Sequence, residues 1–147
     1  MKSDPLITFR RKPPDLDRAA LEAFAETLKE RLAAGREFCC LVSNDDHLRD
    51  LNREFRQKDV PTDVLSFPSG EAAGYLGDIA ISLQRARTQA KQYGHSLDTE
   101  IRVLLLHGVL HLNGMDHETD HGEMAAAEKQ WRGALGLPAS LIERVES

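Results

Sequence analysis

The sequence has few cysteines and no long apolar run. Its only two cysteines are the neighbours Cys39 and Cys40. Adjacent residues on a strand point to opposite faces, so we expect no disulfide between them, and such sparing use of cysteine is typical of a reducing compartment. No apolar stretch approaches the roughly 18 residues that a membrane span requires. Near the N-terminus, Arg10, Arg11 and Lys12 stand where a signal peptide would have apolar residues, so we expect a cytoplasmic protein.

No repeat, low-complexity tract or long linker divides the chain, so we expect one domain over residues 1–147. Hydrophobic residues make up 41% and charged residues 29%, which is ordinary for a globular protein. The net charge of −5 argues mildly against a protein that coats nucleic acid, but it leaves an RNA substrate open. A local basic surface is predicted around Arg49, Arg53, Arg56 and Lys58.

Hydrophobic periodicity, capping residues and turn residues divide the chain into nine predicted elements. In chain order these are a strand at 6–9, a helix from an N-cap at Asp15 to about 35, a strand at 38–42, a helix from an N-cap at Asn44 or Asp45 to about 57, strands at 64–67 and 75–81, and helices at 82–94, 96–112 and 120–134. This order predicts an α+β (α/β-like) single domain, with a small mixed sheet of about four strands packed with about five helices. The strand at 64–67 has Pro61 before it and Pro68 after it, which favours an edge position.

The helix at 96–112 is apolar on nearly every side, yet two histidines interrupt it. His107 and His111 are four residues apart, which stacks their imidazoles on one helix face. Gly114 allows the chain to leave the helix in a left-handed turn, and His117 then returns toward the pair. Three neutral nitrogen ligands suit zinc and leave one position for water, so the sequence predicts a catalytic zinc site at the end of a buried helix.

Carboxylates follow this helix closely and are candidates to orient an imidazole. Asp116 adjoins the third predicted ligand, and Glu118 and Asp120 come next. A hydrogen bond from such a carboxylate commonly fixes the ring of a metal-binding histidine. Solvated surface acids are the simpler interpretation of Glu118 and Asp120.

The histidine spacing equals that of the metzincin peptidases, H-E-x-x-H-x-x-G-x-x-H, with one difference. Position 108 is glycine, where those enzymes place the glutamate that serves as general base. Without that carboxylate, peptide hydrolysis lacks its proton carrier, so a metallopeptidase is disfavoured.

A second stretch favours a phosphate-containing substrate. Arg56 ends a helix just before the predicted edge strand, from where its guanidinium could reach a metal-bound water. The planar fork of arginine matches a phosphate and can offset charge that develops on phosphorus. Thr62, Asp63 and Ser66 could line a substrate groove along the edge strand, or equally could cap a turn and pair a strand.

These stretches resemble the signatures of the YbeY family. Residues 107–117 are similar to H-G-x-L-H-L-x-G-x-D-H, residues 51–68 to L-N-x-x-x-R-x-x-D-x-P-T-D-V-L-S-F-P, and residues 77–79 to G-D-I. The three blocks come in the family's order. The resemblance implies a metal-dependent endoribonuclease specific for single strands, acting in 3′ end maturation of small-subunit ribosomal RNA and in ribosome quality control. Its metal ligands correspond to His107, His111 and His117, and its essential arginine to Arg56.

The resemblance also implies partners, namely ribosomal RNA, the small ribosomal subunit and assembly factors. An alternative is a non-catalytic ribosome-assembly factor stabilised by a structural zinc ion. Structural zinc usually has four protein ligands, for which Cys39 or Cys40 would have to complete the three histidines.

Overall fold

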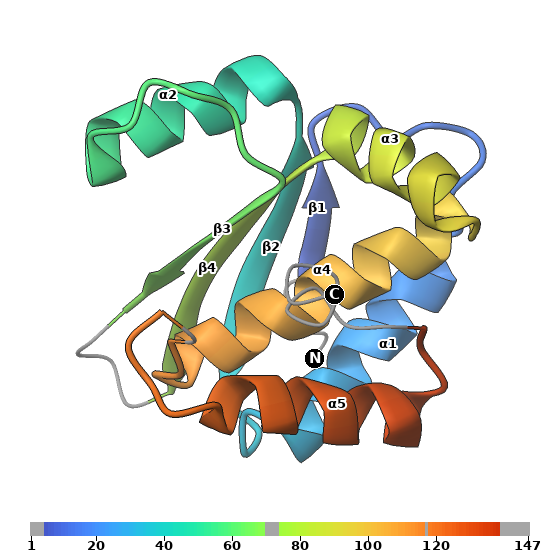
Figure 1. Ribbon diagram of the computed structural model, residues 1–147. Helices are drawn as coiled ribbons and strands as arrows, with labels where there is room; N and C mark the ends of the chain where they lie inside the picture. Colours follow the sequence, from blue (N-terminus) through green and yellow to red (C-terminus); the bar gives the residue numbers. More distant parts are fainter. Residues whose placement is uncertain (1–4, 70–73, 117, 139–147) are drawn as a thin grey trace.

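The structure is a computed structural model that describes residues 5–69, 74–116 and 118–138. The elements are β1 (Ile7–Phe9), α1 (Arg18–Arg31), β2 (Glu37–Ser43), α2 (Asp45–Arg56), β3 (Val64–Pro68), β4 (Tyr75–Ser82), α3 (Leu83–Tyr93), α4 (Leu97–Leu112) and α5 (Glu123–Leu135). Strands and helices alternate up to β3, which is followed directly by β4, and the chain then has three consecutive helices, as the periodicity predicts (Figure 1). No helix in the described part of the chain is long and apolar enough to cross a membrane.

The four strands form one mixed sheet in the order β1-β2-β4-β3. β1, β2 and β4 are parallel, whereas β3 runs antiparallel to β4 at the edge. The predicted edge strand is therefore confirmed, and so is the predicted α+β class with its mixed sheet. Asn44, Ser82 and Ser96 cap their helices with their side chains, as serine and asparagine commonly do.

One predicted helix start is wrong. Asp15 does not cap α1, because a turn joins Pro13 to Leu16 and delays the helix. Asp17 is the N-cap instead, and its carboxylate accepts a hydrogen bond from the N–H of Ala20. Asp15 pairs with Arg87 on α3, which lowers the pKa of Asp15.

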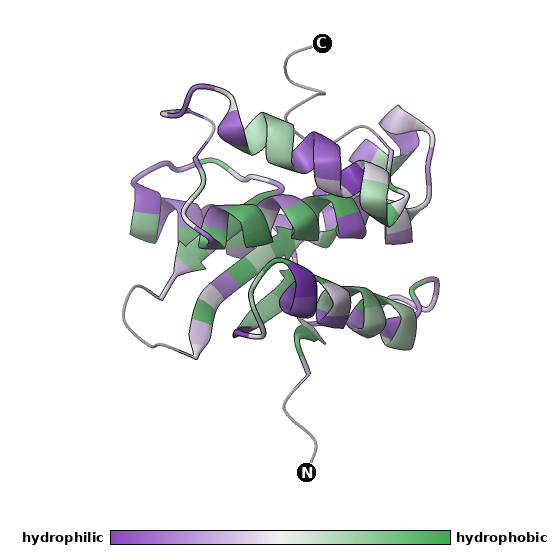
Figure 2. Cartoon of the chain, turned by 90° about the horizontal axis from the view of Figure 1, so that it is seen from below, coloured by the Kyte–Doolittle hydropathy of each residue, from purple (hydrophilic) through white to green (hydrophobic). Residues whose placement is uncertain are grey.

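The two faces of the sheet differ in what covers them. On one face, α4 lies against β3 and β4 and also contacts α1, α3 and α5. Hydrophobic residues run along α4 in the middle of the molecule, whereas the outer helices carry more hydrophilic ones (Figure 2). On the other face, α2 packs on β3 and β4 through a separate small cluster that consists of Leu48, Leu65 and Ala80.

Candidate metal centre

His107 and His111 lie side by side on the last turns of α4. Their ring centroids are 4.7 Å apart, with the ring planes at 74°. His107 is buried and His111 is half-buried, so the pair lies at the boundary between the core and the surface. The structure therefore brings together two of the three predicted ligands. The third, His117, lies outside the described residues.

The residue after the first histidine faces the sheet instead of the imidazole pair. The carbonyl of Gly108 accepts a hydrogen bond from Oγ of Ser66 at 3.2 Å. A Cβ at position 108 would come within 3.0 Å of Cδ1 of Ile79 on β4. Position 108 is thus a packing position, where a glutamate would collide with the sheet. This packing gives a physical reason for the absence of the metzincin glutamate.

The predicted glycine stop after α4 is present. Gly114 has a φ of +92°, and its N–H donates to the carbonyl of His111. Asn113 holds this end of the helix by donating to the carbonyl of Leu32 after α1, at 2.8 Å. The C-terminal end of α4 is therefore fixed against a neighbouring part of the core.

A carboxylate that the motif analysis missed contacts the first histidine. Oε2 of Glu128, on α5, lies 3.1 Å from Nδ1 of His107. Glu128 is completely buried, and its other oxygen, Oε1, has no hydrogen-bond partner among the described residues. A carboxylate in this position can accept the proton of Nδ1, an arrangement that leaves Nε2 as the ring nitrogen for a metal.

Of the acids that the sequence offered for orienting an imidazole, Asp116 and Asp120 bond to backbone N–H groups nearby, and a role toward His117 stays a prediction. The carboxylate of Asp116 accepts from the N–H of Glu118 at 3.0 Å. The carboxylate of Asp120 accepts from the N–H groups of Gly122 and Met124, which fixes the start of α5. These bonds organise the connection between α4 and α5.

Neither cysteine belongs to a metal-binding cluster in the described part of the chain. Within residues 5–69, 74–116 and 118–138, no group of three or more His, Cys, Asp or Glu side chains is arranged to hold a metal ion. Cys40 is fully buried in the large hydrophobic core, and this burial raises the pKa of its thiol. This arrangement weighs against a closed four-ligand site that uses Cys40.

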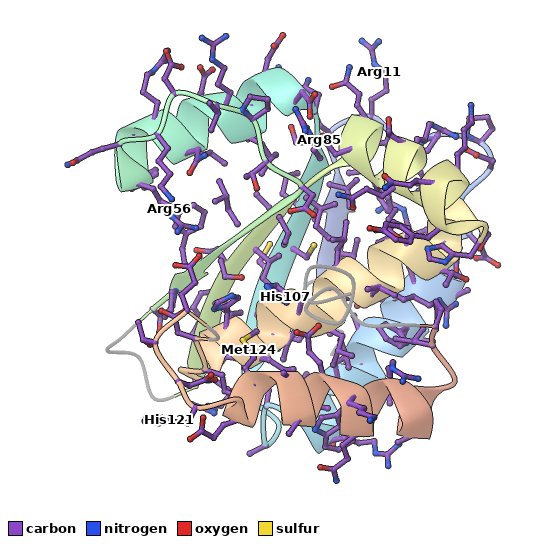
Figure 3. All side chains as sticks on the ribbon, viewed as in Figure 1. Arg11, Arg56, Arg85, His107, His121 and Met124 are labelled. Carbon is purple, nitrogen blue, oxygen red and sulfur yellow. The ribbon has the colours of Figure 1, made fainter. Side chains whose placement is uncertain are left out.

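Arg56 is the last residue of α2 and is exposed. In Figure 3 it lies beside the edge strand β3, and His107 lies on α4 beyond that strand. The other two arginines of α2 are paired, because Arg49 and Arg53 both contact Asp59. Among the described residues, no acid forms an ion pair with Arg56. Two members of the predicted basic surface, Arg49 and Arg53, are thus paired, whereas Arg56 and Lys58 are exposed and form no ion pair with a described residue.

A tight turn orients Arg56. The next residue, Gln57, adopts a left-handed conformation with a φ of +58° and ends the helix. Asn52, which is buried, then donates from Nδ2 to the carbonyl of Val60 at 3.0 Å. The chain after Arg56 is therefore folded back onto α2.

Thr62, Asp63 and Ser66, which could line a substrate groove, form hydrogen bonds within the protein. Asp63 accepts from the N–H of Val64 and from Nε2 of Gln89, and Thr62 lies 3.5 Å from the same carboxylate. Ser66 donates to α4, as described above. These bonds fix β3 to its neighbours, while a role in substrate binding stays a prediction.

A groove of about 530 Å³ lies between α2 and the sheet. Phe55 is 60% exposed, and its ring centroid is 5.3 Å from that of Phe67. The groove is lined by Cys39, Leu41, His47, Leu51, Phe55, Phe67, Asp78, Ile79 and Ala80. The face of the sheet opposite α4 is therefore partly open, and Arg56 follows directly after one of its lining residues.

The three sequence blocks meet in space at Gly77. A Cβ at this residue would lie 2.4 Å from the carbonyl oxygen of Phe67 and 2.8 Å from Cδ2 of Leu112. Gly77 also has a φ of +148°, which L side chains rarely adopt. Only glycine lets β3, β4 and the histidine helix approach so closely, so the blocks form one structural unit.

Comparison with known proteins assigns this unit to a family. The model of the family described as Endoribonuclease YbeY matches residues 7–136. The chain belongs to the YbeY endoribonuclease family. A relative named Endoribonuclease YbeY from Solibacter usitatus is 57% identical over 141 residues, covering 96% of this chain and 95% of the relative. One of the same name from Koribacter versatilis is 48% identical over 139 residues, with 95% and 91% covered.

The fold is also similar to a solved structure. The solution structure of TM1509 from Thermotoga maritima has a TM-score of 0.58 and 28% identity, and 85% of each chain is covered. The YbeY resemblance noted from residues 51–117 is therefore confirmed over nearly the whole chain. Membership places the protein among RNA-cleaving hydrolases, as the resemblance implied.

Proposed function

We propose that this YbeY-family protein is a zinc-dependent endoribonuclease that cuts single-stranded RNA. The substrate would be ribosomal RNA in the cytoplasm, with maturation of the 3′ end of the small-subunit RNA as the main reaction and ribosome quality control as a second role. The small subunit and assembly factors would present this RNA. The observation that carries the proposal is the His107–His111 pair, in which the Glu128 carboxylate holds the buried ring of His107.

The donor set fits zinc. His107, His111 and His117 would supply three neutral imidazoles, and Nδ1 of His107 is already bonded to a carboxylate, a common arrangement for metal-binding histidines. A zinc ion held this way would supply Lewis-acid chemistry, which lowers the pKa of bound water to about 7 or polarises an oxygen of the substrate. The half-buried position of His111 leaves this end of α4 accessible from outside.

Arg56 would bind the phosphate that is attacked. It is exposed, no described acid pairs with it, and its guanidinium can contact two phosphate oxygens at once. That contact would stabilise the negative charge that builds on the phosphate during cleavage. Thr62, Asp63 and Ser66 would border the path of the RNA on β3.

The test measures zinc content and cleavage of single-stranded RNA together, on wild type, His111→Ala and His117→Ala. We expect about one zinc per wild-type chain, and loss of both zinc and cleavage in each variant, because two imidazoles hold zinc far less tightly than three. A matched control is His121→Ala, since His121 is exposed and the proposal gives it no role. Cleavage that survives in zinc-free variants would refute the proposal.

The second candidate is an assembly factor with structural zinc. In that case wild type would hold its zinc tightly and yet leave single-stranded and ribosomal RNA uncut. The metallopeptidase alternative is tested by digestion of casein under the same conditions. We expect no digestion, because Gly108 faces Ile79 and carries no general base.

A further inference from the structure

Two buried glutamates, at opposite ends of α4, each contact a histidine. Glu128 contacts His107 near the C-terminal end of α4, and Glu100 contacts His95 near its N-terminal end, at 2.5 Å. Both glutamates are completely buried. The chemical pair is the same in both places, but among the described residues it is His107 that has a second imidazole beside it, that of His111.

Stability alone does not explain a carboxylate at position 128. Burying a carboxylate is costly unless all its oxygens are satisfied, and Oε1 of Glu128 has no partner among the described residues. Its neighbour one turn earlier on α5 is Met124, which is fully buried and apolar. An apolar residue at position 128 would extend the buried apolar side of α5 on which Met124 lies. The glutamate therefore indicates a requirement other than packing.

We propose that Glu128 is a positioning residue for the metal centre, an inference that rests on the proposed zinc site. By accepting the Nδ1 proton of His107, Glu128 fixes the tautomer in which Nε2 has its lone pair available. It also fixes the direction of the ring relative to His111, since Glu128 is anchored on a different helix from the two histidines. The carboxylate organises the site before a metal arrives.

The experiment uses the full chain with three variants. Glu128→Leu removes the acceptor and fills the space with apolar atoms, so it separates positioning from packing. Glu128→Gln keeps a carbonyl oxygen that can accept from Nδ1 and serves as the conservative rescue. Glu100→Leu is the matched control, because it breaks the equivalent buried pair away from the His107–His111 pair. The readouts are the zinc Kd from competition with a chelator and the melting temperature of the zinc-free protein.

We expect Glu128→Leu to weaken zinc binding about tenfold to a hundredfold, the usual effect of losing such a partner. Its zinc-free melting temperature should stay near that of wild type, because the loss of a buried carboxylate with one unbonded oxygen offsets the loss of the hydrogen bond to Nδ1 of His107. Glu128→Gln should recover a large part of the affinity while remaining at least about threefold weaker than wild type. Glu100→Leu should keep the wild-type Kd whatever happens to its melting temperature.

Wild-type zinc affinity in Glu128→Leu would overturn the inference, as would an equal loss in Glu100→Leu. If Glu128→Leu does not fold, Glu128→Gln decides, and a wild-type Kd there overturns the inference. A wild-type chain that binds no zinc ends both proposals. A chain whose zinc affinity depends on Glu128 but which leaves RNA uncut keeps this inference and refutes the nuclease function alone.

Discussion

The two faces of the sheet are built for different purposes. The face toward α4 belongs to one large core, in which 12 of the 16 residues of that helix are buried. Among the described residues, the face toward α2 has a small cluster of three buried hydrophobic side chains, Leu48, Leu65 and Ala80, with an open groove beside them. One face therefore carries most of the hydrophobic stabilisation, and the other leaves side chains available for contacts outside the chain.

The functional groups follow this division. His107 and Glu128 need fixed directions, and they lie on helices packed into the large core. Arg56 needs access to a substrate, and it lies at the exposed end of the lightly packed helix. The edge strand β3 lies between them and contacts both sides. Ser66 donates a hydrogen bond to α4, and Leu65 packs in the hydrophobic cluster under α2.

The largest effect on stability should come from a cavity on the α4 face. Leu104→Ala should lower the free energy of unfolding by about 3–5 kcal/mol, because Leu104 is fully buried inside the large core. Leu48→Ala should cost only about 2 kcal/mol, since the small cluster borders an open groove. Urea unfolding of both variants gives the two values, and equal losses would contradict the distinction between the faces.

A smaller effect on stability should come from adding one methyl group to α5 or α4, the helices on this side of the sheet. Gly133→Ala should stabilise the protein by about 0.5–1 kcal/mol, because position 133 on α5 is exposed and alanine favours helix. Gly108→Ala gains the same helix preference but forces Ile79 to shift, which costs about 1–3 kcal/mol. Gly108→Ala should thus be the less stable by at least about 1 kcal/mol, and equal stability would show that α4 packs loosely.

Most of the fold was predictable, because its signals are local. Alternating and helical periodicities gave the nine elements, and Pro61 and Pro68 marked the edge strand correctly. The start of α1 was wrong because Asp15 and Asp17 are equally good caps in sequence. Only the tertiary contact of Asp15 with Arg87 and the turn from Pro13 to Leu16 decide between them.

The site was predictable where a spacing encodes geometry. The interval from His107 to His111 predicted adjacent rings, and Gly114 predicted the left-handed stop. Glu128 was missed because its partner is 21 residues away on another helix. A weak signal existed, since Glu128 falls one turn after Met124 on the side of α5 that faces the core.

The pairing of the arginines on α2 was not predictable. Nothing in the sequence showed that Arg49 and Arg53 would be paired and Arg56 would not, since Asp59 reaches α2 only through the turn at Gln57.

The smallest effect on stability should be that of Arg56→Ala, within about 0.5 kcal/mol, because the residue is exposed and lies away from both clusters. Its effect on RNA cleavage should be large.

The decisive measurement compares cleavage of single-stranded RNA and zinc content in Arg56→Ala and in Arg53→Ala. Arg53 is an exposed arginine one turn away that already pairs with Asp50 and Asp59. The account predicts that Arg56→Ala keeps its zinc and loses cleavage at least about a hundredfold, as removal of a transition-state donor does, while Arg53→Ala stays near wild type. Wild-type cleavage by Arg56→Ala, or an equal loss in both variants, would contradict it.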